Sequence, residues 1–279
     1  MIPFSECTVI IPHYGADEQQ ESALDQCFYS LKETIPDIKI LIATNGRKCN
    51  RHDRTHVDLY EQGQCKAVNA AVASTNTEWI FVSNDDMIYP NNWWQRLTSF
   101  YVSKDKMLCV SPKLVEPKQG APTFIVKPFG GVTDFNKIAF ENFAREREHP
   151  QELYKTGFNL PFLIKRDLWD TIGGYDINFD PWGSNGDSDL EYKIKLAGIQ
   201  PYQSQDAVVY HFSQTSGTFS PENQGYWKKN WDYFIEKWGF ERTDKGIWEA
   251  TFDIPKERIF KPDYEDKYIA WDDPTRSDV

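Results

Sequence analysis

The chain has 279 residues, of which 40% are hydrophobic and 15% aromatic, and this is enough for a sizeable core. Its formal net charge of −11 argues against a passive nucleic-acid binder, and no apolar run approaches the ~20 residues of a membrane span. The amino-terminal residues do not resemble a signal peptide, and five cysteines without a Cys-x-x-Cys pair predict free thiols in a reducing cytoplasm.

Predicted strands and helices alternate along the first part of the chain. Short β-branched or apolar runs predict strands at residues 7–11, 38–43, 79–83 and 107–115. Apolar residues at helical spacing predict helices at residues 17–34, 67–73 and 93–101. This alternation is typical of an α/β fold with a mostly parallel central sheet flanked by helices. Residues 116–155 interrupt it with Gly and Pro, and a functional lid and a surface insertion both remain open there.

Two adjacent carboxylates, Asp85 and Asp86, directly follow the predicted strand at 79–83. Open α/β sheets bind ligands at the carboxyl ends of their strands, and carboxylates are ligands that Mg²⁺ and Mn²⁺ prefer. The turns at 12–14 and 44–46 should open on the same edge. No glycine-rich phosphate loop is present, so a nucleotide held here would need a metal at its phosphates. The alternative is that both aspartates are turn residues.

A second constellation lies in the later part of the chain, where Asp187 and Asp189 follow a glycine-containing loop and open a predicted helix. Acidic residues at a helix start are favoured by the helix dipole, which is a structural explanation. A carboxylate fixed at that position can also serve as a general base. His211 ends a predicted strand at 207–211, where it is either a functional residue or a hydrogen-bonded structural one.

Taken together, these segments resemble the inverting family-2 glycosyltransferases, whose A-type fold is nucleotide-diphospho-sugar transferase-like. The resemblance covers roughly residues 8–239 and is carried, in chain order, by Val9-Ile-Ile-Pro12, Thr44-Asn45-Gly46, Ala67-Val-Asn69-Ala-Ala71, Asn84-Asp85-Asp86, Gly186-Asp187-Ser188-Asp189-Leu190, Val209-Tyr-His211 and Phe234-Ile-Glu-Lys-Trp-Gly239. The sequence departs from the family pattern at three positions, with Gly186 in place of a Glu, Thr44 in place of an Asp, and Asn84 at the first position of the Asp-x-Asp element.

The resemblance implies a nucleoside diphosphate sugar donor, Mn²⁺ or Mg²⁺, and a hydroxyl acceptor on a glycan, a glycolipid or a modified base. It implies Asp86 and His211 as metal ligands and Asp187 as the general base, with Asp189 supporting the base or touching the sugar. The donor-binding residues that it implies are Pro12, Tyr14, Thr44, Asn45, Asn69, Asn84, Asp85 and Trp182, the last as an aromatic platform. No stable nucleic-acid complex and no membrane span are expected.

The expected organisation is a catalytic domain over residues 1–240, with a nucleotide-sugar-binding half at 1–115 and an acceptor-binding half at 116–240. Residues 241–279 are expected to form an extension that packs back on this domain. Three other functions stay open. A sugar-nucleotide pyrophosphorylase would share the metal and the sheet, but its glycine-rich basic signature is missing. An inactive binding protein would fit Gly186, and an enzyme that glycosylates a modified nucleic-acid base would share every donor motif.

Overall fold

The computed structural model describes residues 2–15, 17–46, 56–59, 63–99, 109–118, 123–147, 149–155, 157–213, 215 and 221–238. The strands are β1 (Cys7–His13), β2 (Lys39–Asn45), β3 (His56–Leu59), β4 (Trp79–Val82), β5 (Met87–Ile88), β6 (Cys109–Glu116), β7 (Ile125–Val126), β8 (Leu153–Tyr154), β9 (Phe162–Lys165) and β10 (Tyr202–His211). The α-helices are α1 (Glu18–Thr34), α2 (Gln64–Ala73), α3 (Trp93–Thr98), α4 (Lys137–Glu146), α5 (Arg166–Ile172), α6 (Gly186–Leu196) and α7 (Gln224–Trp238), and short 3₁₀ helices span Phe4–Glu6, Ile177–Phe179 and Pro221–Asn223.

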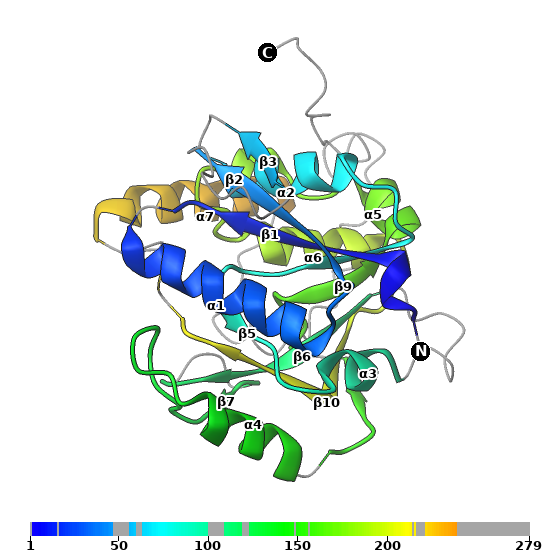
Figure 1. The fold of residues 1–279 in the computed structure, drawn as a ribbon. Helices are drawn as coiled ribbons and strands as arrows, with labels where there is room; N and C mark the ends of the chain where they lie inside the picture. The colour runs from blue at the N-terminus through cyan, green and yellow to red at the C-terminus, as the bar shows by residue number, and fades with distance from the viewer. Residues whose placement is uncertain are drawn as a thin grey trace.

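Within these ranges the strands form one sheet in the order β3-β2-β1-β4-β9-β6-β10-β5, with β7 beside β6 and β8 beside β10 (Figure 1). β1 pairs in parallel with β2 and β4, and β10 pairs in parallel with β6. β9 is antiparallel to both β4 and β6, so β4 and β6 run in the same direction. The carboxyl ends of β1, β2, β4, β6 and β10 therefore meet at one edge of a mostly parallel sheet, as the sequence predicted.

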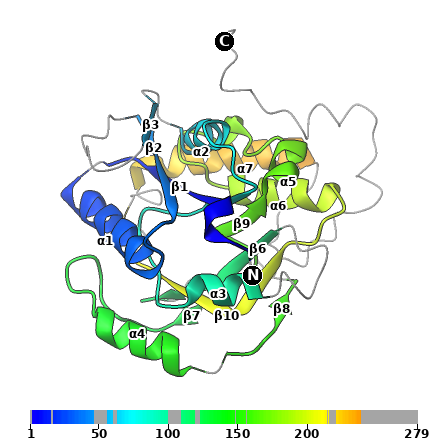
Figure 2. The ribbon, with the colours of Figure 1, turned by 45° about the vertical axis from the view of Figure 1, so that its right-hand side comes forward.

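The sheet is buried on both faces because successive side chains of its central strands enter two different hydrophobic clusters. In β1, Val9 and Ile11 pack in the cluster that includes α1 and α3, whereas Ile10 packs in the cluster that includes α2, α5, α6 and α7. Figures 1 and 2 show these two sets of helices on opposite sides of the sheet. A strand covered on both faces needs an uninterrupted apolar run, which explains the Val9–Ile11 sequence.

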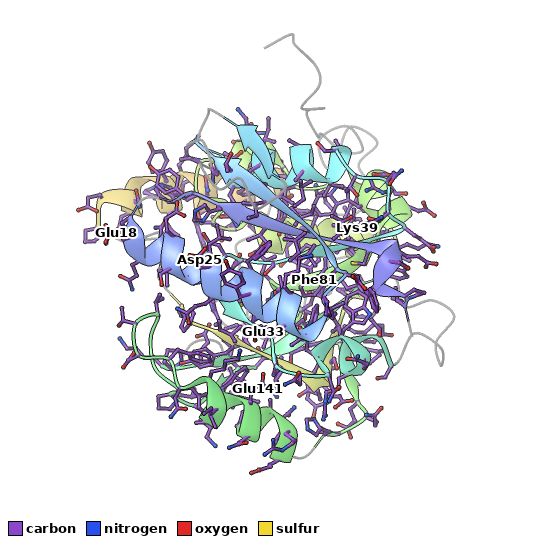
Figure 3. The ribbon with its side chains drawn as sticks, in the orientation of Figure 1. Glu18, Asp25, Glu33, Lys39, Phe81 and Glu141 are labelled. Atoms are coloured by element: carbon purple, nitrogen blue, oxygen red, sulfur yellow. The ribbon has the colours of Figure 1, made fainter. Side chains whose placement is uncertain are left out.

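Helix α1 illustrates how one amphipathic helix covers its face of the sheet. Leu24, Cys27 and Leu31 are fully buried, and Asp17 caps the helix by accepting a hydrogen bond from the Gln20 backbone N–H. In Figure 3 three acidic side chains follow one another along α1, and Phe81 of β4 lies behind the helix; the three are Glu18, Asp25 and Glu33. Apolar spacing predicted a helix at residues 17–34, and the helix in the structure spans Glu18–Thr34.

β1 continues past the point where the sequence predicted its end. Pro12 was expected to stop the strand, but the strand runs to His13, with Pro12 opposite Ala43 of β2. Pairing with β4 ends at Ile10 and Val82. Beyond that point β1 has one paired neighbour, and a residue without an N–H is tolerated there because no second ladder is interrupted.

Several other elements differ from the sequence-based expectations. Residues 116–155, where the alternation of strands and helices was interrupted, contain the helix α4, which begins at Lys137 and buries Phe140 and Ala144. The antiparallel strand β9 and the helix α5 were not predicted. Residues 241–279, which were expected to form an extension packed on the domain, lie outside the described residues. In the described part of the chain, no helix is long and apolar enough to cross a membrane.

Candidate active site

The polar residues predicted to act together follow the ends of parallel strands at one edge of the sheet. β1, β2, β6 and β10 end there at His13, Asn45, Glu116 and His211, and the segment after β4 carries Asp85 and Asp86. This is the edge at which open α/β sheets bind ligands.

Asp86 and His211 face each other, with His211 Nε2 3.2 Å from Asp86 Oδ1. The other ring nitrogen of His211 lies 2.7 Å from Glu116 Oε1, and the Thr215 hydroxyl donates to Asp86 Oδ2 at 2.8 Å. Burial alone would lower the pKa of His211, but Asp86 and then Glu116 raise it to about 10. The two carboxylates therefore favour a positive charge at this position, which either a proton on the imidazole or a bound cation in place of that proton would supply.

The donor set of Asp86 and His211 fits a divalent cation. A carboxylate oxygen and an imidazole nitrogen lie within one hydrogen bond of each other, and both are ligand types that Mn²⁺ accepts. Glu116 binds the far nitrogen of the ring, which is how metal-binding histidines are commonly oriented. Among the described residues no group of three or more His, Cys, Asp or Glu side chains is placed to hold a metal. A two-residue set suits a cation that is completed by substrate phosphates and water.

Asp85 turns away from Asp86 toward the end of β1. Its Oδ2 lies 2.7 Å from Nδ1 of His13, a side chain that is 3% exposed, and Nε2 of His13 lies 3.4 Å from Glu21 Oε1. Burial alone would lower the pKa of His13, but Asp85, and after it Glu21, raise it above its ordinary value. The two adjacent aspartates thus have separate histidine partners, one from β1 and one from β10.

The amino-terminal end of α2 is tied to the site from both halves of the chain. The side-chain oxygen of Asn45 accepts a hydrogen bond from the Gly63 backbone N–H. Asp180 accepts from the backbone N–H groups of Cys65 at 2.8 Å and Lys66 at 3.1 Å. Burial raises the pKa of Asp180 to about 6. Asn45 and Asp180 therefore satisfy the free N–H groups that every helix start leaves.

Tyr14 and Trp182 meet across the site, with ring centroids 5.4 Å apart in an edge-to-face arrangement. Tyr14 follows β1, whereas Trp182 lies in the loop before α6. Asn230 of α7 holds this loop by donating to the carbonyls of Phe179 at 2.6 Å and Ser184 at 3.1 Å. Two of the predicted donor-binding residues thus come together from segments that are far apart in the sequence.

The two aspartates at the start of α6 have different surroundings. Asp187 is exposed, and its Oδ1 accepts a hydrogen bond from the Tyr175 hydroxyl at 2.7 Å. Asp189 has no exposed surface, and its Oδ1 binds Lys237 Nζ at 2.7 Å and Trp238 Nε1 at 2.9 Å. Of these two aspartates, Asp187 is the one that a substrate can reach. The burial of Asp189 favours a role in supporting Asp187 over direct contact with the sugar.

The remaining predicted donor-binding residues lie deeper in the protein. Pro12 is buried within β1, and Thr44 is buried within β2. Asn69 is buried in α2, where its amide nitrogen donates to the Tyr175 carbonyl and its oxygen accepts from the Tyr175 N–H. Both polar groups of the Asn69 side chain are thus bonded to the backbone of Tyr175, and its contact with the donor stays a prediction. Asn84 is half-buried, and its carbonyl accepts a hydrogen bond from the neighbouring Ser83 hydroxyl.

Three residues at the site had no role in the sequence-based prediction. His13 and Glu116 each end a parallel strand, and that position is the signal that would have found them. Tyr175 follows a Gly-Gly pair in a segment without clear periodicity, and only the fold reveals its contact with Asp187.

The sheet order, the parallel strand ends and the carboxylates at that edge define an α/β fold of the nucleotide-sugar transferase type. Residues 8–124 match the family described as "Glycosyl transferase family 2". This match supports the predicted resemblance to family-2 glycosyltransferases and the assignment to a glycosyltransferase enzyme. Similar solved structures support the predicted A-type fold. A search of curated proteins found no sequence match for the chain.

Three solved structures illustrate the shared fold. GalNAc-T7 with UDP, GalNAc and Mn²⁺ is 15% identical with a TM-score of 0.59, and the match covers 92% of this chain but 54% of that one. The mannosyltransferase PcManGT from Pyrobaculum calidifontis, in complex with GDP-Man and Mn²⁺, is 16% identical with a TM-score of 0.53, and the match covers 83% and 64%. TarS 1–349 of S. aureus is 11% identical with a TM-score of 0.51, and the match covers 86% and 74%. The chain thus spans only about half of GalNAc-T7.

Proposed function

We propose that this chain transfers a sugar from a nucleoside diphosphate sugar to a hydroxyl group of a glycan or glycoconjugate, with inversion at the anomeric carbon. The observation that carries the proposal is the meeting of Asp86 and His211 at the sheet edge where nucleotides bind in such folds. The family match over residues 8–124 supports the same reaction class. The nucleotides in the similar structures, UDP and GDP-Man, support a nucleoside diphosphate donor.

In this proposal Asp86 and His211 hold Mn²⁺ or Mg²⁺, with Glu116 orienting the histidine. When bound, the cation would offset the negative charge that develops on the leaving diphosphate. Asp85 lies beside this position and is held by His13, so we assign it to the donor's ribose or sugar hydroxyl groups. The raised pKa of His13 favours its protonated form, which would offset the charge of Asp85 and limit its repulsion of a diphosphate.

Asp187 is the proposed general base. Its carboxylate would take the proton of the acceptor hydroxyl while the acceptor oxygen bonds to the anomeric carbon and the bond from that carbon to the diphosphate breaks. The exposure of Asp187 supports this role, and so does its position two residues into α6, where the helix dipole favours a carboxylate. Tyr14 and Trp182 would line the space between base and donor, with an aromatic face against the sugar ring.

The domain organisation and location belong to the same proposal. We assign residues 1–115 to donor binding and 116–240 to acceptor binding, in keeping with the place of the proposed base Asp187 in the second segment, from which Trp182 and His211 would also contribute to the donor site. Residues 241–279 would be an extension on this domain. A cytoplasmic location is supported by Cys7, Cys27, Cys65 and Cys109, which are free and buried; Cys49 lies outside the described residues.

The test is a transfer assay with a panel of nucleotide sugars, Mn²⁺ or Mg²⁺ and glycan acceptors, comparing the parent with Asp187→Asn. We expect the parent to release nucleoside diphosphate and to form a product of inverted anomeric configuration, which NMR identifies. Asp187→Asn keeps the shape of the side chain and should lose ~10²–10⁴-fold in turnover while it binds the donor like the parent.

Other outcomes would contradict the proposal in distinct ways. Formation of nucleoside triphosphate from pyrophosphate would identify a pyrophosphorylase instead. Donor binding without turnover on any acceptor would indicate a binding protein. Transfer only to DNA or RNA that carries a hydroxylated base would retain the chemistry but overturn the glycan acceptor. An Asp187→Asn variant with parental turnover would show that the base lies elsewhere.

A further inference from the structure

Tyr175 connects the candidate base to the protein interior. Its side chain is 3% exposed and lies in the segment between α5 and the 3₁₀ helix at Ile177–Phe179. Its hydroxyl donates to Asp187 Oδ1 at 2.7 Å. Because Asp187 itself is exposed, this hydrogen bond joins a side chain at the surface to one that is locked in the core.

The backbone of Tyr175 is held by a second residue, Asn69 of α2. The Asn69 amide nitrogen donates to the Tyr175 carbonyl at 2.8 Å, and the Tyr175 N–H donates back to the Asn69 oxygen at 2.9 Å. Gly174 makes this close approach possible, because a Cβ at that position would lie 2.6 Å from the Asn69 oxygen. Paired bonds of this kind fix both the position and the direction of the backbone.

The ring of Tyr175 is fixed as well. It packs against Trp169 and Phe162, with centroid separations of 5.6 and 6.5 Å. Burial, with the nearby charge of Asp187, raises the pKa of Tyr175 well above its ordinary value, so the hydroxyl keeps its proton and acts as a donor at neutral pH. Hydrogen bonds thus join Asn69 of α2 to the backbone of Tyr175, and the hydroxyl of the same Tyr175 to Asp187 at the start of α6.

We propose that Tyr175 is a positioning residue that holds the carboxylate of Asp187 in the orientation needed to accept the acceptor's proton, and that Asn69 fixes Tyr175 for this purpose. This inference rests on the proposed function, because it assigns Tyr175 a task only if Asp187 is the base. Tyr175 acts through Asp187 and does not itself touch the substrate. A base must lie within hydrogen-bond reach of the proton that it removes, and a displacement of about 1 Å can cost ~10²-fold in rate.

The experiment is a double-mutant cycle of Tyr175→Phe and Asp187→Asn in the full chain, with Mn²⁺ and the donor and acceptor that support transfer. Tyr175→Phe keeps the packed ring and removes only the hydroxyl. We expect its kcat to fall roughly ten- to a hundredfold, with the donor Kd from calorimetry and the melting temperature close to those of the parent. In the Asp187→Asn background the same change should have little further effect on kcat, because the group that it positions is already gone.

Tyr233→Phe is the matched control. The Tyr233 hydroxyl also donates to a carboxylate, Asp176 Oδ2 at 2.8 Å, but that carboxylate is not part of the candidate site. We expect Tyr233→Phe to leave kcat within about twofold of the parent, since Lys237 still pairs with Asp176 and Asp189 when this hydroxyl is removed.

Each adverse result overturns a definite part of the proposal. If Tyr175→Phe turns over like the parent while Asp187→Asn is impaired, the positioning role is wrong and the proposed base stands. If Tyr175→Phe lowers kcat by the same factor in both backgrounds, or if Tyr233→Phe lowers it equally, the effect is one of general packing and the inference fails. If Asp187→Asn keeps parental turnover, the base assignment fails and the role of Tyr175 fails with it.

Discussion

Lys237 of α7 and Asp189 of α6 form an ion pair without any exposed side-chain surface, and their Nζ and Oδ1 atoms lie 2.7 Å apart. Lys237 also lies 2.7 Å from Asp176 Oδ2, another fully buried carboxylate. Trp238 Nε1 donates to Asp189 as well. This buried network joins α7 to the start of α6, two residues from Asp187. Asp189, which resembles part of a catalytic motif, therefore connects two helices in this structure.

We expect Lys237→Met to lower the free energy of unfolding by about 3–5 kcal/mol, because it removes the cation that contacts both Asp176 and Asp189 and leaves only Lys193, 3.8 Å from Asp189, to offset these buried charges. Urea unfolding at pH 7 measures this. The matched control is Lys228→Met on the same helix, whose pair with Asp232 is exposed and whose loss should change stability by no more than ~0.5 kcal/mol. Equal small effects of the two substitutions would show that the buried network contributes little.

The same network predicts a dependence of stability on pH. Burial alone would raise the pKa of Asp176, but the charge of Lys237 and its hydrogen bond lower it below the ordinary value. A carboxyl with a lower pKa in the folded state stabilises the fold above its unfolded pKa of ~3.9, and that contribution is lost as pH falls through the folded pKa. The urea midpoint should therefore fall less steeply below about pH 5 in Asp176→Asn than in the parent. Identical slopes would contradict this.

The parts of the site that follow strand ends were predictable from the sequence. Asp85, Asp86 and His211 each come directly after an apolar run, and parallel strands bring such positions together. The hydrogen-bond partners of Asn69 and Asp189 were not predictable, because they are distant in the sequence. Asn69 binds Tyr175, 106 positions away, and nothing local to either residue indicates this pairing.

For the sheet, too, local sequence predicted some features and not others. The apolar run of β9 (Phe162–Lys165) has the same character as that of a parallel strand, so its antiparallel insertion between β4 and β6 depends on the path of the chain and not on local pattern. The extension of β1 through Pro12 likewise depends on where β4 stops pairing. Local pattern thus predicted the type of most elements, whereas tertiary neighbours decided their ends and directions.

Gly174 offers a test of the close packing around Asn69, with Gly198 as its control. Both have positive φ, +62° and +75°, so alanine strains the backbone at either site by ~1–2 kcal/mol. At Gly198 the new Cβ meets nothing within 4 Å, whereas at Gly174 it would lie 2.8 Å from the Trp169 ring and closer still to Asn69. Gly174→Ala should therefore cost ~1–3 kcal/mol more in unfolding free energy than Gly198→Ala. If the two substitutions cost the same unfolding free energy, Asn69 and Trp169 move aside freely for the new Cβ.

The last prediction concerns the metal, and it separates direct ligands from the residue that orients them. Asp86→Asn keeps the size of the side chain and an oxygen for the Thr215 hydroxyl, but it removes the anionic ligand. We expect calorimetric titration with Mn²⁺, in the presence of a nucleoside diphosphate, to show no metal-dependent gain in nucleotide affinity for this variant. Transfer should be lost in it, as it should be for the parent in excess EDTA.

Glu116→Gln should have a smaller effect on the same titration. Glu116 binds Nδ1 of His211 at 2.7 Å and leaves Nε2 facing Asp86, so its removal loosens the ligand without deleting it. Loss of such an orienting partner typically weakens metal binding by ~10–100-fold. His211→Ala should weaken Mn²⁺ affinity further, with little change in melting temperature. A large fall in the melting temperature of His211→Ala with unchanged Mn²⁺ affinity would instead assign the Asp86–His211–Glu116 contacts a structural role.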